Sequence, residues 1–122
     1  MDSKIEKIEA FKQKTKQLSL RVILLFQQMP KTDEAKIIGK QLLRSSTSVA
    51  ANYRAACRAR SDAEFFSKIS IVIEEADKTL FWLELLSEAN IIATEKLASL
   101  KSEYEEVVKI VNTIRFKKKH KG

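Results

Sequence analysis

Basic side chains dominate the stretch from Ala35 to Arg60, which contains six Lys or Arg residues and no Asp or Glu. Projected on a helix at about 100° per residue, the first five fall within an arc of roughly 80°, away from the apolar positions. Such a ridge would be about 33 Å long and could pair with several phosphates of a nucleic-acid backbone. The alternative is a solvated basic face, as most charge runs are. The six residues are Lys36, Lys40, Arg44, Arg54, Arg58 and Arg60.

Charge is segregated along the rest of the chain. Residues 31–60 hold seven basic and two acidic side chains, a net charge of +5, whereas residues 61–90 hold two basic and seven acidic ones, a net charge of −5. A second positive element runs from Arg115 to Lys121. Aromatic side chains do not alternate with these bases, so phosphate contact is the expected mode of binding and not base stacking.

Groups that could support catalysis are few. The only histidine is His120, so the inward Glu-x-x-His sets of di-iron bundles cannot form, and no Gly-rich phosphate loop, zinc-type cysteine pair or Ser-His-Asp set is present. Glu74, Glu75 and Asp77 form an acidic cluster, which we expect to be solvated or paired with a basic neighbour. We therefore expect no enzyme activity, no catalytic residue, no metal and no cofactor. The lone cysteine, Cys57, is expected to be a small buried hydrophobe.

Four amphipathic helices must position these side chains. With two glycines and one proline, the chain lacks the tight turns that β-sandwiches and barrels need. Apolar residues recur every three or four positions in four segments: from Ser3 to Pro30, from about Thr32 and Asp33 through Ala56, from Ser61 to about Asn90, and from about Thr94 onward. Short links force neighbouring helices to run antiparallel. The sequence predicts an all-α, up-down-up-down four-helix bundle over residues 1–116, followed by a basic C-terminal tail over residues 117–122.

The apolar stripes give a predicted core with contributions from all four segments. Its members are Ile8, Phe11, Leu18, Val22, Leu25, Met29, Ala35, Ile38, Leu42, Ser46, Val49, Tyr53, Ala56, Phe65, Ile69, Val72, Ala76, Leu80, Leu83, Leu97, Leu100, Tyr104, Val107, Val111 and Ile114.

Two further groups of apolar residues point away from these stripes. They lie in the C-terminal halves of the first and third helices, which run parallel and sit diagonally in this topology. The two patches therefore lie on opposite sides of the bundle at a similar height along its axis, which suits head-to-tail association of copies into a ring. The alternative is a broad stripe that packs against neighbouring helices. The predicted interface residues are Leu20, Ile23 and Leu24 in the first helix, and Phe81, Trp82 and Leu85 in the third.

The N-terminal residues alternate charged and apolar side chains, unlike a secretory leader, and no apolar run approaches the roughly 20 residues of a membrane span. A cytoplasmic protein without membrane contact is expected.

Two sequence stretches carry a family resemblance: residues 41–53, Gln-Leu-Leu-Arg-Ser-Ser-Thr-Ser-Val-Ala-Ala-Asn-Tyr, and residues 60–65, Arg-Ser-Asp-Ala-Glu-Phe. Together with Pro30, Glu75-Ala76-Asp77 and Trp82-Leu83-Glu84, they resemble the bacterial four-helix-bundle proteins encoded by intervening sequences of 23S ribosomal RNA genes, over roughly residues 15–115. That family is similar to the accessory protein of diversity-generating retroelements, which partners a reverse transcriptase and nucleic acid.

The resemblance implies a homopentameric ring without enzyme activity. It also implies that Arg44, Arg54, Arg58 and Arg60 belong to a positive surface, whereas Asn52 and Glu64 are structural. Two functions stay open: an oligomeric accessory protein that binds RNA or DNA through the second helix, or a protein-binding adaptor whose bases pair with an acidic partner.

Overall fold

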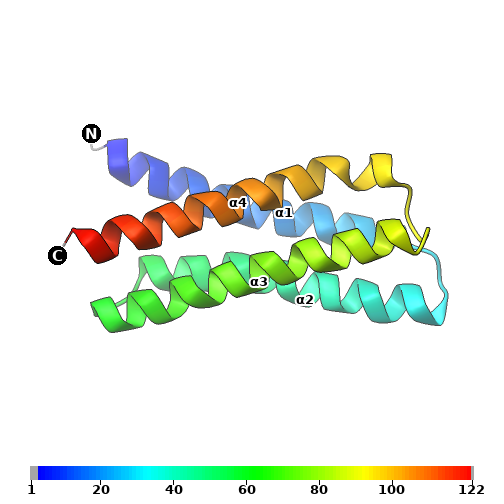
Figure 1. Ribbon diagram of the computed structural model, residues 1–122, viewed down its shortest axis with the longest axis horizontal. Coiled ribbons are helices and arrows are strands. Elements are labelled where there is room, and N and C mark those ends of the chain that lie inside the picture. The colour runs from blue at the N-terminus through cyan, green and yellow to red at the C-terminus, as the bar shows by residue number, and fades with distance from the viewer. Residues whose placement is uncertain (1–2, 122) are drawn as a thin grey trace.

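The computed structural model describes residues 3–121 and is built from four long helices. They are α1 (Ser3–Gln27), α2 (Asp33–Cys57), α3 (Asp62–Glu88) and α4 (Thr94–His120). Consecutive helices pack against each other, and α1 also contacts α4. In this part of the chain, α1 makes no contact with α3. Both termini lie at the end of the bundle that also holds the α2–α3 link (Figure 1). The predicted all-α, up-down-up-down bundle, with α1 and α3 on a diagonal, is confirmed.

Local signals place the helix ends as the sequence predicted. The Thr32 side chain caps α2 by accepting a hydrogen bond from the Ala35 backbone N–H, and Ser61 does the same for α3 with the Glu64 N–H. The Glu64 carboxylate accepts in turn from the Arg60 N–H at 3.1 Å, which completes a reciprocal cap. After α3, Asn90 takes a left-handed backbone conformation with φ of 57°, a common way to end a helix.

The core follows the predicted stripes closely. Most of the predicted members are buried, and Leu25, Ile38, Phe65, Leu80 and Ile114 are partly buried against them. Where α1 crosses α2, a Cβ atom added at Gly39 would come within 2.7 Å of the Phe26 ring. Glycine therefore allows the two helices to approach closely at this level.

A layer of buried hydroxyl groups joins all four helices inside this apolar core. Ser46 of α2 shares a 2.5 Å hydrogen bond with the phenol of Tyr104 in α4, and Ser19 of α1 donates to the Ser46 carbonyl oxygen. On the other side of α2, Thr79 of α3 donates to the Ser45 hydroxyl at 2.8 Å. Because a buried polar group is costly without a partner, these bonds favour one axial register, that is, one position of each helix along the bundle axis relative to the others.

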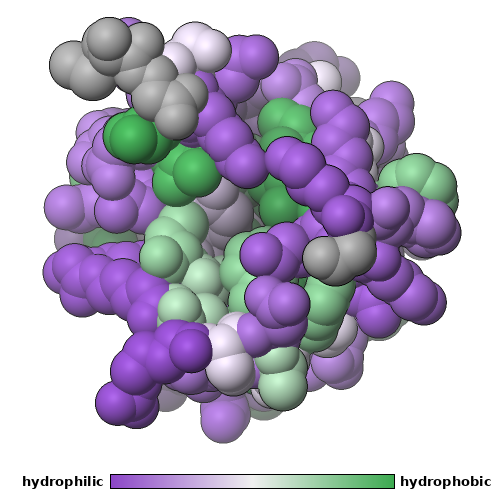
Figure 2. Space-filling model, turned by 90° about the vertical axis from the view of Figure 1, so that its left-hand side faces the viewer, coloured by the Kyte–Doolittle hydropathy of each residue, from purple (hydrophilic) through white to green (hydrophobic). Residues whose placement is uncertain are grey.

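Contacts between α1 and α4 are the sparsest of any neighbouring pair. Polar side chains span part of this seam, where Arg21 donates to the Ser99 hydroxyl and Lys14 pairs with Glu103. The end of the bundle that carries the termini has a hydrophilic rim, with apolar side chains visible at its centre (Figure 2). Within residues 3–121, none of the helices is long and apolar enough to cross a membrane.

The expectation that Cys57 is buried is wrong, because its thiol is exposed. Cys57 is the last residue of α2, where the charged side chains of Glu9 and Lys12 from α1 are close enough to affect its thiol. Partial burial still raises the pKa of the thiol, which disfavours the reactive thiolate.

Tyr104 makes the stability of the fold sensitive to alkaline pH. Burial raises the pKa of its phenol to about 12, from about 10 in an unfolded chain. Between these values the unfolded chain loses a proton that the folded chain keeps, so stability is full below pH 10 and falls as pH rises toward 12. We expect a loss on the order of 2–3 kcal/mol from this residue, measured by urea unfolding across that range. Tyr104→Phe should lose less stability over the same interval, and equal losses in parent and variant would contradict this assignment.

Candidate nucleic-acid interface

The basic residues predicted from the sequence all reach solvent. Lys36, Lys40, Arg44, Arg54 and Arg58 are exposed, the first four within α2 and Arg58 directly after it, and Arg60 is exposed in the link to α3. No acidic side chain interrupts this surface between Ala35 and Arg60. We call these six residues the α2 ridge.

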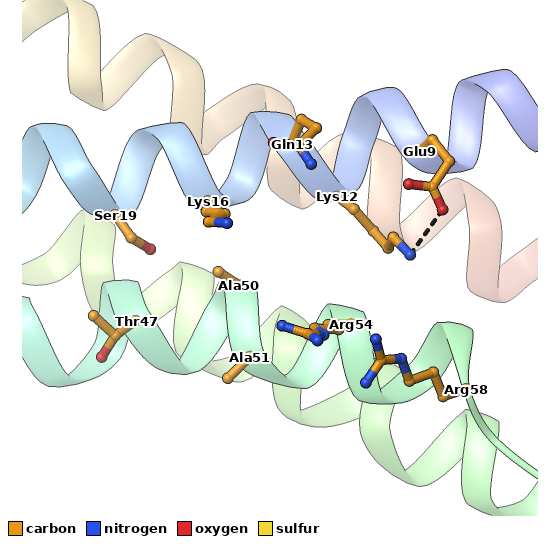
Figure 3. Close-up of a pocket in the computed structure, with 10 residues that line it drawn as sticks. All are labelled: Glu9, Lys12, Gln13, Lys16, Ser19, Thr47, Ala50, Ala51, Arg54 and Arg58. Atoms are coloured by element: carbon orange, nitrogen blue, oxygen red, sulfur yellow. Dashed lines mark ion pairs between the residues drawn. The ribbon is translucent and has the colours of Figure 1, made fainter.

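The structure adds a feature that the sequence did not predict, a groove between α1 and α2. Its volume is about 480 Å³, and it lies beside the C-terminal half of α2. Lys12 and Lys16 of α1 face Arg54 and Arg58 of α2 across it (Figure 3). The remaining lining residues are Glu9, Gln13, Ser19, Thr47, Ala50 and Ala51.

The groove has a strong excess of positive charge. Among the lining residues that the structure describes, Glu9 has the only carboxylate, and it forms an ion pair of 2.8 Å with Lys12. Within residues 3–121, the side chains of Lys16, Arg54 and Arg58 form neither an ion pair nor a hydrogen bond with another residue. Three cationic groups are therefore available to an anion from outside the chain.

Lys12 and Lys16 were missed although no Asp or Glu lies within residues 10–32. The other basic residues of the helix in this stretch, Lys14 and Arg21, project on different faces from Lys12 and Lys16, so they do not form one long ridge as in α2. The spacing of four residues does place Lys12 and Lys16 on one face, one turn apart. Only the packing of α1 on α2 shows that this face meets the α2 ridge.

The second basic element is helical, since α4 continues through residues 117–120. Lys118 pairs with Asp62 at 3.3 Å and lies 5.7 Å above the Phe65 ring, which ties the end of α4 to the start of α3. Phe116, 62% exposed, stacks on His120. Gly122, the last residue of the predicted tail, lies outside the described residues.

The two apolar patches predicted as interfaces are present in part. Leu20 and Leu24 of α1 and Phe81 of α3 are 46%, 57% and 55% exposed. Ile23, Trp82 and Leu85 are half-buried, and Trp82 also packs against the core and the edge of the Phe81 ring. Ile37, next to the α2 ridge, is 64% exposed and was not predicted.

The acidic cluster of α3 offers no metal site, because no group of three potential ligands converges among residues 3–121. Glu75 instead pairs with Lys78 at 3.0 Å.

Comparison with known proteins identifies the family of this bundle. Residues 7–113 match the model of the family described as 23S rRNA-intervening sequence protein. The chain belongs to this 23S rRNA-intervening sequence protein family. The match covers all but the two ends of the bundle, and it includes both the α2 ridge and the groove.

A solved structure from the family has the same fold. It is a protein of unknown function, described as a member of the S23 ribosomal protein family, from Bacteroides thetaiotaomicron. It shares 34% sequence identity with this chain, with a TM-score of 0.81, over 89% of this chain and 97% of the other. No match is found among curated proteins.

Proposed function

We propose that this chain is a cytoplasmic, non-enzymatic, homo-oligomeric protein that binds RNA or DNA through the α2 ridge. The observation that carries the proposal is the ridge itself: six exposed cations within 25 residues, uninterrupted by acid. Each can neutralise one phosphate, and the acidic α3 would repel the same ligand, which gives the bundle one binding side. The family name, which refers to intervening sequences of 23S rRNA, makes RNA the first ligand to test.

The same proposal includes self-association, with a ring of five copies as the form that the family resemblance implies. Leu24 has Arg21 one turn away on α1, whereas Phe81 has Asp77 and Glu84 as well as Lys78 one turn away on α3. The charge beside the α1 patch is thus positive, and the net charge beside Phe81 is negative. Contact between the α1 patch of one copy and the α3 patch of the next would bury both and pair those charges.

The binding proposal is tested by removing three charges from the ridge. Changing Arg44, Arg54 and Arg58 to Gln keeps good helix formers in place. Affinity should fall about equally for unrelated sequences, because phosphates carry no sequence information. The slope of log affinity against log salt should shrink by about two to three, since each lost contact with duplex DNA removes about 0.9. Fluorescence anisotropy over a salt series measures both quantities.

A matched control removes three charges elsewhere. Lys96, Lys101 and Lys109 are exposed on α4, so changing them to Gln lowers the net charge equally without touching the ridge. The control should bind nearly as the parent does. Equal losses in both triple variants would show that net charge matters and the ridge does not.

A protein-binding adaptor is the second candidate, and Ile37 is the observation that favours it. Its exposed side chain lies beside Lys36 and Lys40, with Asp33 and Glu34 one turn before it, and an exposed apolar group suits contact with a protein surface better than contact with a phosphate backbone. A nucleic-acid enzyme such as a reverse transcriptase would be one such partner. If the ridge variant binds RNA and DNA as tightly as the parent while staying folded, the adaptor function becomes the better proposal.

A further inference from the structure

The groove between α1 and α2 differs from the ridge in being lined from two helices. Lys12 and Lys16 approach it from α1, and Arg54 and Arg58 approach it from α2 (Figure 3). A ligand in the groove would therefore meet cations on both sides, whereas a ligand on the ridge alone meets them on one. Two-sided contact fixes the path of a flexible chain more strongly than one-sided contact.

Small residues leave the groove open on its α2 side. Ala50 and Ala51 lie between Thr47 and Arg54, and neither can extend into the space. The Thr47 hydroxyl donates to backbone carbonyl groups of its own helix, so it does not close the groove either. The lining thus combines short side chains with long cationic ones, which allows a ligand backbone to come close to α2.

The size of the groove selects among nucleic acids. A volume of about 480 Å³ lies in the range of small-ligand pockets, roughly 300–1,000 Å³, and it suits a nucleotide-sized segment. A duplex is too wide to enter and could only rest its phosphates on the rim. A single strand can place its sugar–phosphate backbone between the helices and leave its bases in solvent.

We propose that the α1–α2 groove binds the sugar–phosphate backbone of a single-stranded RNA or DNA segment, with the unpaired Lys16, Arg54 and Arg58 as phosphate ligands and Lys12, which exchanges its ion pair with Glu9 for a phosphate, as the fourth. This inference rests on the proposed nucleic-acid binding and adds to it a preference for single strands and two ligands from α1. The Gln13 amide, also in the lining, supplies a further hydrogen-bonding group for phosphate or sugar oxygens.

The test compares two double variants with the same loss of charge. Lys12→Gln with Lys16→Gln changes the groove alone, whereas Lys36→Gln with Lys40→Gln changes the ridge beyond the groove. Each is titrated with a labelled single-stranded oligouridylate and with a duplex RNA of the same length. The groove variant should lose about tenfold or more in affinity for the single strand, and its salt slope should shrink by about 1.4 for two contacts. Its loss on the duplex should be no larger than that of the ridge variant.

Each other outcome has a defined meaning. If both variants weaken both probes equally, the groove is only part of a uniform basic face, and this inference fails while the proposed function stands. If the parent binds neither probe, both proposals fail. If the groove variant has a different mass in light scattering from the parent, another copy of the chain covers the groove, and the inference is overturned.

Discussion

Replacing Tyr104 with alanine is expected to lower the free energy of unfolding by about 3–5 kcal/mol. Tyr104 is fully buried and is the largest of the fully buried side chains among residues 3–121, so truncation leaves a cavity at the centre of the bundle. It also removes the cross-helix partner of the Ser46 hydroxyl. Urea unfolding followed by circular dichroism measures the change.

Tyr104→Phe separates the two contributions to that loss. The phenyl ring keeps most of the packing volume but leaves Ser46 without its bond to α4, which should cost about 1–3 kcal/mol. If the alanine variant loses no more stability than the phenylalanine variant, the core relaxes around the cavity, and Tyr104 contributes mainly through its hydroxyl group.

The hydroxyl layer shows what apolar periodicity predicts and what it leaves out. Ser46 and Tyr104 fall at core positions of their helices, so the sequence placed both inside. Periodicity describes one helix at a time, however, and it does not give the axial register of one helix against another. The bond between Ser46 and Tyr104, 58 positions apart in the chain, follows from that alignment and required the structure.

The candidate site was predictable to the same degree. Projection of one helix was enough to find the α2 ridge, because its first five members project within one arc and no acid interrupts them. The groove depends on how α1 is rotated about its axis against α2, which the sequence of α1 alone does not fix. Lys12 and Lys16 therefore became candidates only once the structure showed that they line the same groove as Arg54 and Arg58.

The ends of the helices were predictable where a residue has a specific effect on the backbone. Pro30 and the left-handed Asn90 mark two links correctly. The last turns of α4 had no such marker. Lysine is a good helix former, and positive charge near a helix C-terminus interacts favourably with the helix dipole, so the basic segment continues the helix to His120.

Self-association should be abolished by a single charge in either apolar patch. In a head-to-tail ring, every contact uses the α1 patch of one copy and the α3 patch of another, so Leu24→Glu alone or Phe81→Glu alone breaks all contacts at once. Each variant should run as a 14.0 kDa monomer in light scattering, with unchanged helicity because both side chains are exposed. A parent protein that is itself monomeric at micromolar concentration would contradict the proposal.

Mixing the two single variants distinguishes head-to-tail contact from contact between identical patches. Leu24→Glu keeps an intact α3 patch and Phe81→Glu keeps an intact α1 patch, so one head-to-tail contact can still form between them. The mixture should give a species of twice the chain mass that cannot grow, because both remaining patches carry a Glu. If identical α1 patches paired instead, Phe81→Glu would associate by itself, and adding Leu24→Glu would change nothing. Association in the mixture is expected to be weak, because an open pair lacks the added stability of ring closure. The mixture should therefore be measured at protein concentrations well above those at which the parent assembles.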